Sequence, residues 1–314
     1  MKRSLMLYFL VLSSITALMT AENDIFFSKN ASSDFIIRWA FQKECDHVFD
    51  PRKSPYVWPT SSRGVSFDPA RVNAGDCIFV RNVDLFFKDY HPRIVSPYIL
   101  ITHGENLDAV KDRHLDYLED QKVIAWFGIH PCAKKHPRFY ALPLGILQDP
   151  NNYKNREKLN KFLENLRVHS HKDHLLYMNF ADDQKPERKK LKALLLHKNY
   201  CKRGARQSFL QYLTEMSHCI FTLAPKGLGP DSYRIWESLL VGSIPIIKTS
   251  QLDPLFKELP VLVVSHWEEI TQEFLEKKQV EIASKKYNLK RLYMSYWRAK
   301  IKKIKYRFLA RYNL

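Results

Sequence analysis

The chain has 314 residues, of which 45% are hydrophobic and 26% charged, and its formal net charge is +17. This length and apolar content suit two domains of ordinary size, each with its own core. The sequence has no low-complexity stretch and no repeat at a fixed period, which excludes repeat proteins and low-complexity chains.

The N-terminus has the pattern of a targeting segment. Lys2 and Arg3 precede an apolar run from Leu5 to Met19, and the small residue Ala21 suits the end of a cleavage site. The run is shorter than the roughly 20 residues that a membrane span needs. Residues 1–21 are therefore predicted to be a signal peptide or a single membrane anchor.

Residues 22–150 are predicted to form a first α/β domain. Its expected elements, in chain order, are strands at Cys77–Val80 and Tyr98–Ile101, a helix at Asp108–Asp120, and strands at Val123–Phe127 and Phe139–Leu142. Strands that alternate with a helix in this way are typical of a parallel sheet.

Residues 151–173 are polar, with one charged helix, and are predicted to connect the two domains. The histidines at 169, 171 and 174 surround Asp173, and imidazoles are common metal ligands. They lie in a polar connector without cysteines or a fixed helical spacing, so the pattern favours a solvated linker, and no metal site is predicted.

Residues 174–280 are predicted to form the second domain. Its expected elements are a strand at Leu175–Phe180, helices at Pro186–His197 and Arg206–Ser217, strands at Ile220–Ala224, Ile244–Ile247 and Val261–Val264, and a helix from Trp267. A loop that contains Gly227 follows the strand at Ile220–Ala224, and Asp231 or Ser232 then caps a helix that ends at Gly242. In open α/β sheets ligands bind at such a loop, at the carboxyl end of its strand.

Two charged residues on this helix indicate the ligand. A helix N-terminus suits a phosphate, and Arg234, one turn in, adds a fork of donors for phosphate oxygens. Glu237 lies three residues further along the same face, where a carboxylate repels phosphate but suits the two hydroxyls of a ribose. The pattern predicts a nucleotide with its diphosphate at the cap and its ribose at Glu237. The alternative is an Arg–Glu pair on an ordinary surface helix.

Other residues are predicted to contact the same ligand. Lys226, Gly227 and the backbone of Leu228 lie in the loop and, together with Arg234, suit the diphosphate of the nucleotide. Asn179 and Lys185 follow the first strand of the second domain and share its ligand edge. For these two, placement on a surface loop without any contact is an equal alternative.

These residues carry a resemblance to a known family. Phe221–Gly227, Asp231–Leu239 and Gly242–Ile246 resemble the nucleotide-sugar half of exostosin-type glycosyltransferases, and a looser likeness extends from Asp76 to about Glu269. The resemblance implies the GT-B architecture, in which two Rossmann-like domains face each other across a cleft. It also implies transfer of a sugar from a UDP- or GDP-linked donor to a glycan hydroxyl, with inversion, without an essential metal and without a further cofactor.

A transferase of the other common class needs Asp-x-Asp at a strand end to hold a metal, and no two aspartates of this chain are two residues apart. Inverting transfer requires a base for the acceptor hydroxyl. The candidates follow predicted strands of the first domain and are, in order of preference, Glu105, His103 and Asp84. The resemblance assigns no base.

The C-terminal segment 281–314 is predicted to be a basic amphipathic helix. Residues 285–311 contain eleven lysines and arginines and no acid, and apolar residues recur there at spacings of three and four. Its apolar stripe is expected either to pack on the first domain or to meet an anionic membrane surface. Nucleic acid is not an expected partner, because no binding module accompanies the charge.

Two other functional classes remain open from the sequence. One is a non-catalytic descendant that binds a glycan or a nucleotide, and the other is a membrane-surface structural protein that depends on the basic tail. For an active transferase, the leader predicts a secretory or Golgi-type lumen, where activated sugars are imported. A bacterial source would instead place the enzyme on the cytoplasmic side of the membrane.

Overall fold

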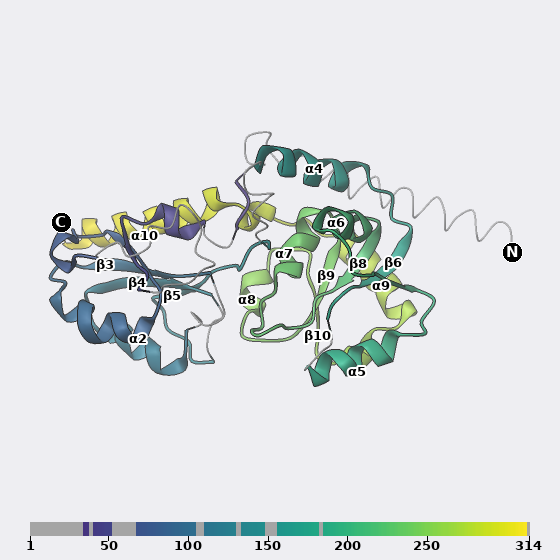
Figure 1. Ribbon diagram of the computed structural model, residues 1–314, viewed down its shortest axis with the longest axis horizontal. Helices are drawn as coiled ribbons and strands as arrows, with labels where there is room; N and C mark the ends of the chain where they lie inside the picture. The colour runs from purple at the N-terminus through teal and green to yellow at the C-terminus, as the bar shows by residue number, and fades with distance from the viewer. Residues whose placement is uncertain are drawn as a thin grey trace, which may run out of the picture. The chain divides into compact units, whose positions relative to one another are not determined.

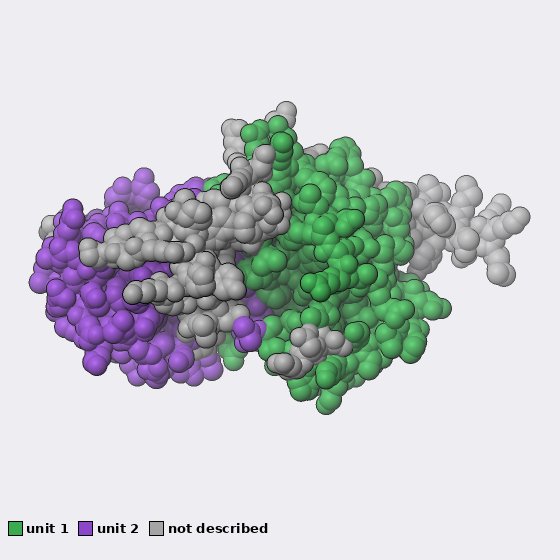
Figure 2. All heavy atoms as spheres, in the orientation of Figure 1, with its two compact units in different colours: residues 1–35, 146–227, 232–293 green, residues 36–145, 228–231, 294–314 purple. Residues whose placement is uncertain are grey.

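A computed structural model describes residues 34–37, 40–51, 67–104, 110–129, 133–147, 156–181 and 185–312. The chain divides into two compact units (Figure 2). Unit 1 comprises Met1–Phe35, Ile146–Gly227 and Ser232–Tyr293, and unit 2 comprises Ile36–Gly145, Leu228–Asp231 and Met294–Leu314. The predicted leader, residues 1–21, lies outside the described residues.

Unit 2 is built on a parallel sheet. Its strands are β1 (His47–Phe49), β2 (Cys77–Val80), β3 (Tyr98–Thr102), β4 (Val123–Gly128) and β5 (Phe139–Ala141). Its helical segments are the 3₁₀ turns Phe41–Glu44, Pro69–Arg71, His91–Arg93 and Asp112–Glu119, the short helix α2 (Val83–Leu85), the π turn Phe86–Tyr90, and the long helix α10 (Met294–Tyr312). The expected helix at Asp108–Asp120 is thus a 3₁₀ segment over its described part.

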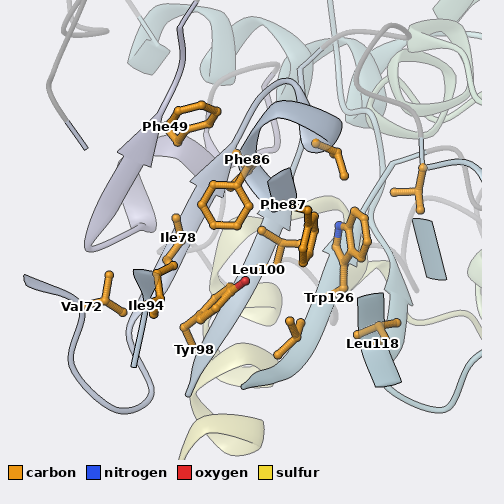
Figure 3. Close-up of a cluster of buried hydrophobic side chains, with 14 of the residues drawn as sticks. Phe49, Val72, Ile78, Phe86, Phe87, Ile94, Tyr98, Leu100, Leu118 and Trp126 are labelled. Carbon is orange, nitrogen blue, oxygen red and sulfur yellow. The ribbon is translucent and has the colours of Figure 1, made fainter. Parts of the chain in front are cut away.

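The described strands of unit 2 lie in the order β1-β2-β3-β4-β5, all parallel. Right-handed crossovers between strands in sequential order all lie on one face of a sheet. That face carries an aromatic-rich core in which Phe86, Tyr98 and Trp126 are fully buried (Figure 3).

The C-terminal helix α10 covers the opposite face of the same sheet. In Figure 1, α10 and α2 lie on either side of β3, β4 and β5, and α10 packs against β4. Trp297 and Ile301 on α10 are buried, as are Phe79 and Phe127 on the strands. The tail is therefore an integral layer of unit 2.

Unit 1 is built on a second parallel sheet. Its strands are β6 (His174–Met178), β7 (Cys201–Arg203), β8 (Cys219–Leu223), β9 (Ile244–Lys248) and β10 (Leu262–Val264). Its helices are α4 (Arg156–His169), α5 (Pro186–Leu195), α6 (Phe209–Ser217), α7 (Tyr233–Leu240), α8 (Asp253–Phe256), α9 (Gln272–Ala283) and the 3₁₀ turns Trp267–Glu269 and Leu289–Leu292.

The described strands of unit 1 lie in the order β10-β9-β8-β6-β7. The chain leaves β6 toward β7 and then crosses back to β8, so α5 lies on one face of the sheet and α6 on the other (Figure 1). Helices α5 and α9 bury Leu191 and Leu275 against the sheet. Helices α4, α6 and α7 pack against one another.

The predicted fold class is confirmed, since the chain forms two parallel, Rossmann-like α/β sheets and ends in a basic helix. The cleft between the two units stays a prediction. The unit boundaries differ from those expected, because α4, expected in a connector, belongs to unit 1. Its Leu159, Leu163 and Leu166 form a buried stripe at helical spacing within a charged sequence.

The tail also differs in detail from the single helix that was expected. The chain is extended at Tyr293, where it forms an antiparallel bridge with Phe35, and α10 begins only at Met294. Asn288 caps the preceding 3₁₀ turn by accepting a hydrogen bond from the backbone N–H of Lys290. Among the described residues, no helix is both long enough and apolar enough to span a bilayer.

Candidate functional site

The strand order of unit 1 has a switch point between β6 and β8, where the fold predicts a ligand crevice. At this point the chain has gone to one side of β6 to form β7 and returns on the other side to form β8. In open α/β sheets, ligands bind outside the carboxyl ends of the strands at such a switch point. The segments there are Asn179–Ala181, after β6, and Ala224–Gly227, after β8.

Helix α7 begins beside this crevice. Ile235 and Trp236 are buried, and Gly242 ends the segment in the left-handed region at φ +73°. Ser232 is the N-cap, with extended backbone angles and no side-chain capping bond. The expected cap at Asp231 or Ser232 is therefore Ser232, which acts through its backbone.

Two polar atoms at the start of α7 are buried without partners. In the part of the chain that the structure describes, neither Ser232 Oγ nor Arg234 Nε has a hydrogen-bond partner. Buried polar atoms are normally satisfied, and a helix N-terminus adds unpaired N–H groups and partial positive charge. These features make the first turn of α7 suited to an anion.

Arg188, in the first turn of α5, links the two loops of the crevice. Its guanidinium donates to the carbonyl oxygens of Ala181 (3.0 Å), Pro225 (3.2 Å) and Lys226 (3.0 Å). One side chain thereby fixes the segments that follow β6 and β8 against each other. The sequence analysis missed this residue; its position in the first helical turn after the strand, behind Pro186, was the available signal.

Lys226 is exposed and pairs with the neighbouring Glu187. Its Nζ lies 3.2 Å from Glu187 Oε2, and Trp267 Nε1 donates to the other carboxylate oxygen at 3.0 Å. Burial alone would raise the pKa of Glu187, but the hydrogen bonds from Trp267 and Lys226 hold it below the ordinary value. The predicted contact of Lys226 with a diphosphate therefore competes with a protein carboxylate.

Glu237 is buried, with 4% of its surface exposed. Its two carboxylate oxygens accept hydrogen bonds from the Leu147 backbone N–H (3.1 Å) and the Tyr212 hydroxyl (3.0 Å). Burial raises its pKa, and the nearby charge of Arg234 opposes this rise. The carboxylate thus already has two protein donors, and its contact with a ribose stays a prediction.

The rest of the predicted donor loop is divided between the two units. Gly227 belongs to unit 1, whereas Leu228, 78% exposed, and Asp231 belong to unit 2. Asp231 is buried, and its carboxylate accepts a hydrogen bond from the Leu144 N–H at 2.7 Å. Asp231 is thus engaged within unit 2.

Asn179 and Lys185 occupy the edge at which they were expected. Asn179 Nδ2 donates to the Tyr177 hydroxyl (2.9 Å) and to the Ala205 carbonyl (3.2 Å). Lys185 immediately precedes α5 and makes no side-chain cap. Ligand contact by either residue stays a prediction.

The candidate bases lie in unit 2, and two of the three fall within the described residues. Asp84 receives two 2.7 Å hydrogen bonds from Arg113 and lies 3.1 Å from His114 Nε2. The hydrogen bond from Arg113 holds the pKa of Asp84 below its ordinary value, which weakens it as a base. His103 is fully buried and donates through Nε2 to the Pro143 carbonyl at 2.9 Å. Glu105 lies outside the described residues.

The histidine cluster lies at the opposite, amino end of the unit 1 sheet. His218 Nδ1 is 2.9 Å and His171 Nδ1 is 3.4 Å from the carboxylate of Asp173. Within the described ranges, no group of three or more His, Cys, Asp or Glu residues is placed to hold a metal ion.

A family comparison covers the unit that contains this crevice. The family described as "RXYLT1 C-terminal domain" matches residues 147–312, just over half of the chain. This chain belongs to the RXYLT1 C-terminal domain family. The family is related to glycosyltransferases. Its matched range includes β6, Arg188, the loop after β8, and α7.

Two solved structures are similar to the chain at 11% sequence identity. One is the GtfA/B complex, with a TM-score of 0.37, and the other is the pneumococcal O-GlcNAc transferase GtfA in complex with UDP and GlcNAc, with a TM-score of 0.33. Each alignment covers 75% of this chain but 58% of the other, so the chain spans less than two thirds of their length. No curated protein matches the chain.

Proposed function

We propose that the protein is a glycosyltransferase that binds the diphosphate of a nucleotide sugar at the start of α7. The observation that carries the proposal is the pair of buried, unpartnered atoms, Ser232 Oγ and Arg234 Nε, beside the switch point of unit 1. A diphosphate supplies the acceptors that these donors need, and the first turn of a helix favours its charge.

Family membership and local sequence support the same reading. The RXYLT1 C-terminal domain family is related to glycosyltransferases, and its match includes the whole β8–α7–β9 segment. Within that segment, Asp231–Leu239 carries the resemblance to the exostosin type, which implies a UDP- or GDP-linked donor, a glycan acceptor, and inversion.

The reaction that fits these residues is a direct displacement at the anomeric carbon of the donor sugar. The acceptor oxygen forms a bond to that carbon while the bond to the diphosphate oxygen breaks, and the acceptor proton passes to a base. Negative charge grows on the departing diphosphate, where Arg234 and the helix N-terminus stabilise it. Among the candidate bases, Glu105 is the first to test, because Asp84 is paired with Arg113 and His103 is buried against Pro143.

Calorimetry with a panel of UDP- and GDP-sugars tests the donor site. Replacing Arg234 by alanine removes a charged hydrogen-bonding group, so the binding free energy of the nucleotide sugar is expected to weaken by about 1.5–3 kcal/mol. The matched control is Lys302→Ala, which removes an exposed cation on α10, in the other unit. Equal affinity in wild type and Arg234→Ala would reject the site.

An assay for hydrolysis of the bound nucleotide sugar distinguishes an enzyme from a protein that only binds. An active transferase is expected to release free sugar slowly from the preferred nucleotide sugar without any acceptor. Tight donor binding with no release and no transfer to a glycan panel would instead identify the non-catalytic descendant. Substitution of Glu105 by glutamine is expected to lower transfer while leaving donor affinity unchanged.

A further inference from the structure

A hollow lies in unit 1 on the side of β6 that faces β7. It has a volume of about 960 Å³ and opens at the carboxyl ends of β6 and β7. Asn179, Phe180, Lys192, Arg203, Gly204 and Arg206 contribute to its wall. It shares the segment Asn179–Ala181 with the crevice, but neither Ser232 nor Arg234 lines it.

The wall of this hollow is cationic. Lys192 comes from α5, Arg203 from the end of β7, and Arg206 from the segment before α6, and its described lining contains no acidic residue. The surrounding sequence has the same sign, because residues 181–206 contain nine lysines and arginines against three acids. This is a second basic region, separate from the tail, and it favours an anionic ligand.

A hydrogen-bonded network holds the side chains beneath the hollow in place. The fully buried Tyr177 donates its hydroxyl to Glu215 at 2.8 Å and accepts from Asn179 (2.9 Å) and Gln207 (3.3 Å). Gly204 approaches this network so closely that an added Cβ would lie 2.4 Å from the Tyr177 hydroxyl oxygen. Buried networks of this kind, when satisfied, make a site rigid.

The size and composition of the hollow define the class of ligand. Small-molecule sites typically measure roughly 300–1,000 Å³, far more than one inorganic phosphate occupies. Phe180 offers an apolar ring for the carbon skeleton of a ligand. Each arginine can donate two parallel hydrogen bonds to the oxygens of a phosphate. We propose that this hollow binds a phosphate ester of sugar-phosphate size, in addition to any ligand at α7. The assignment does not depend on the proposed transferase activity.

Calorimetry with glucose 6-phosphate, compared with glucose, tests the assignment. Wild type is expected to bind glucose 6-phosphate and not glucose. The double variant Arg203→Gln/Arg206→Gln removes two guanidinium groups from the wall and is expected to weaken binding by about tenfold or more. The single variant Lys192→Gln provides a second measurement, from a different element, should the double variant unfold.

The matched control is Lys302→Gln/Lys303→Gln on α10, which removes the same charge from the other unit. It is expected to change affinity by less than about twofold, because salt screens distant surface charges. Arg234→Gln separates the two sites and is expected to leave glucose 6-phosphate binding intact while weakening UDP binding. The assignment is overturned if wild type binds no glucose 6-phosphate, if the wall variants behave like the control, or if Arg234→Gln abolishes binding.

Discussion

The two sheets of this protein have similar strand numbers over their described parts but different strand orders. Unit 2 runs β1-β2-β3-β4-β5, whereas unit 1 runs β10-β9-β8-β6-β7. Only the second order reverses direction, so within the described residues the switch point of a doubly wound sheet occurs in unit 1 alone. The strand order is therefore one reason to propose the donor site in unit 1, and it needs no reference to a ligand.

The same difference explains the role of the C-terminal helix. In unit 1 the crossovers change face once, after β7, and α5 and α6 cover the two sides of the sheet (Figure 1). In unit 2 the crossovers lie on one face, and α10 covers the other with Trp297 and Ile301. The apolar stripe of the tail is thereby used within the fold, which leaves its exposed basic face available to solvent or partners.

The largest predicted effect tests this role of α10. Trp297→Ala removes a side chain that is 1% exposed, and it is expected to lower the free energy of unfolding by about 3–5 kcal/mol. The control is Tyr306→Ala on the same helix, where the side chain is 57% exposed and the loss is expected to stay within about 0.5 kcal/mol. Denaturant unfolding measures both, and hydrogen exchange should assign the loss to unit 2. Equal losses would show that α10 does not complete the sheet.

A pH series tests Lys172, which lies just before the amino end of β6. Its ammonium group donates to the carbonyls of Ser217 (2.6 Å) and Cys219 (3.4 Å), and burial lowers its pKa from 10.5 to about 8. Between these values the unfolded chain binds the proton more strongly, so stability rises with pH. Between pH 8 and 10.5 the free energy of unfolding of the wild type is expected to rise by at most about 3 kcal/mol relative to that of Lys172→Met. The same difference in unfolding free energy between the two proteins at both pH values would contradict this.

Two glycines near the crevice are expected to differ in how strongly an added side chain lowers stability. Gly242 ends α7 at φ +73°, so Gly242→Ala is expected to destabilise the protein by about 1–2 kcal/mol. At Gly227 an added Cβ would meet its nearest neighbour, Arg188, at an ordinary 3.6 Å. Gly227→Ala is therefore expected to have the same unfolding temperature as the wild type. A stability loss in Gly227→Ala as large as in Gly242→Ala would show that the loop cannot accommodate the added Cβ.

The smallest predicted effect concerns Arg188, which positions both loops of the crevice. Arg188→Lys retains the charge but cannot reach all three carbonyls, and we expect donor affinity to fall about fivefold, with little change in unfolding temperature. Lys190→Arg on α5 is the control. A loss of stability without a change in affinity would make Arg188 a structural residue and not a positioning one.

The sequence predicted those parts of the fold that depend on continuous apolar runs. Strands such as Cys77–Val80 and Ile244–Lys248 are buried on both faces, and their nearly unbroken runs of apolar residues indicate this burial. Strands β1 and β7 were missed because they are three residues long and contain His47, Lys202 and Arg203, which edge strands tolerate.

The site was predictable only where local spacing defines it. Ser232 and Arg234 follow a strand and a glycine loop, so their place at the ligand edge could be read from the chain. The contacts of Arg188 with three carbonyls, and of Glu237 with Leu147 and Tyr212, join residues up to 90 positions apart, which spacing does not encode.

Hydrogen exchange with and without UDP and GDP is the sharpest test of a nucleotide site in unit 1, because it reports on both sheets in one experiment. We expect protection of the segments that follow β6 and β8 and of the first turn of α7, residues 179–188 and 224–236, and loss of this protection in Arg234→Ala. Protection confined to the strand ends of unit 2, around residues 81–84 and 102–104, would contradict it.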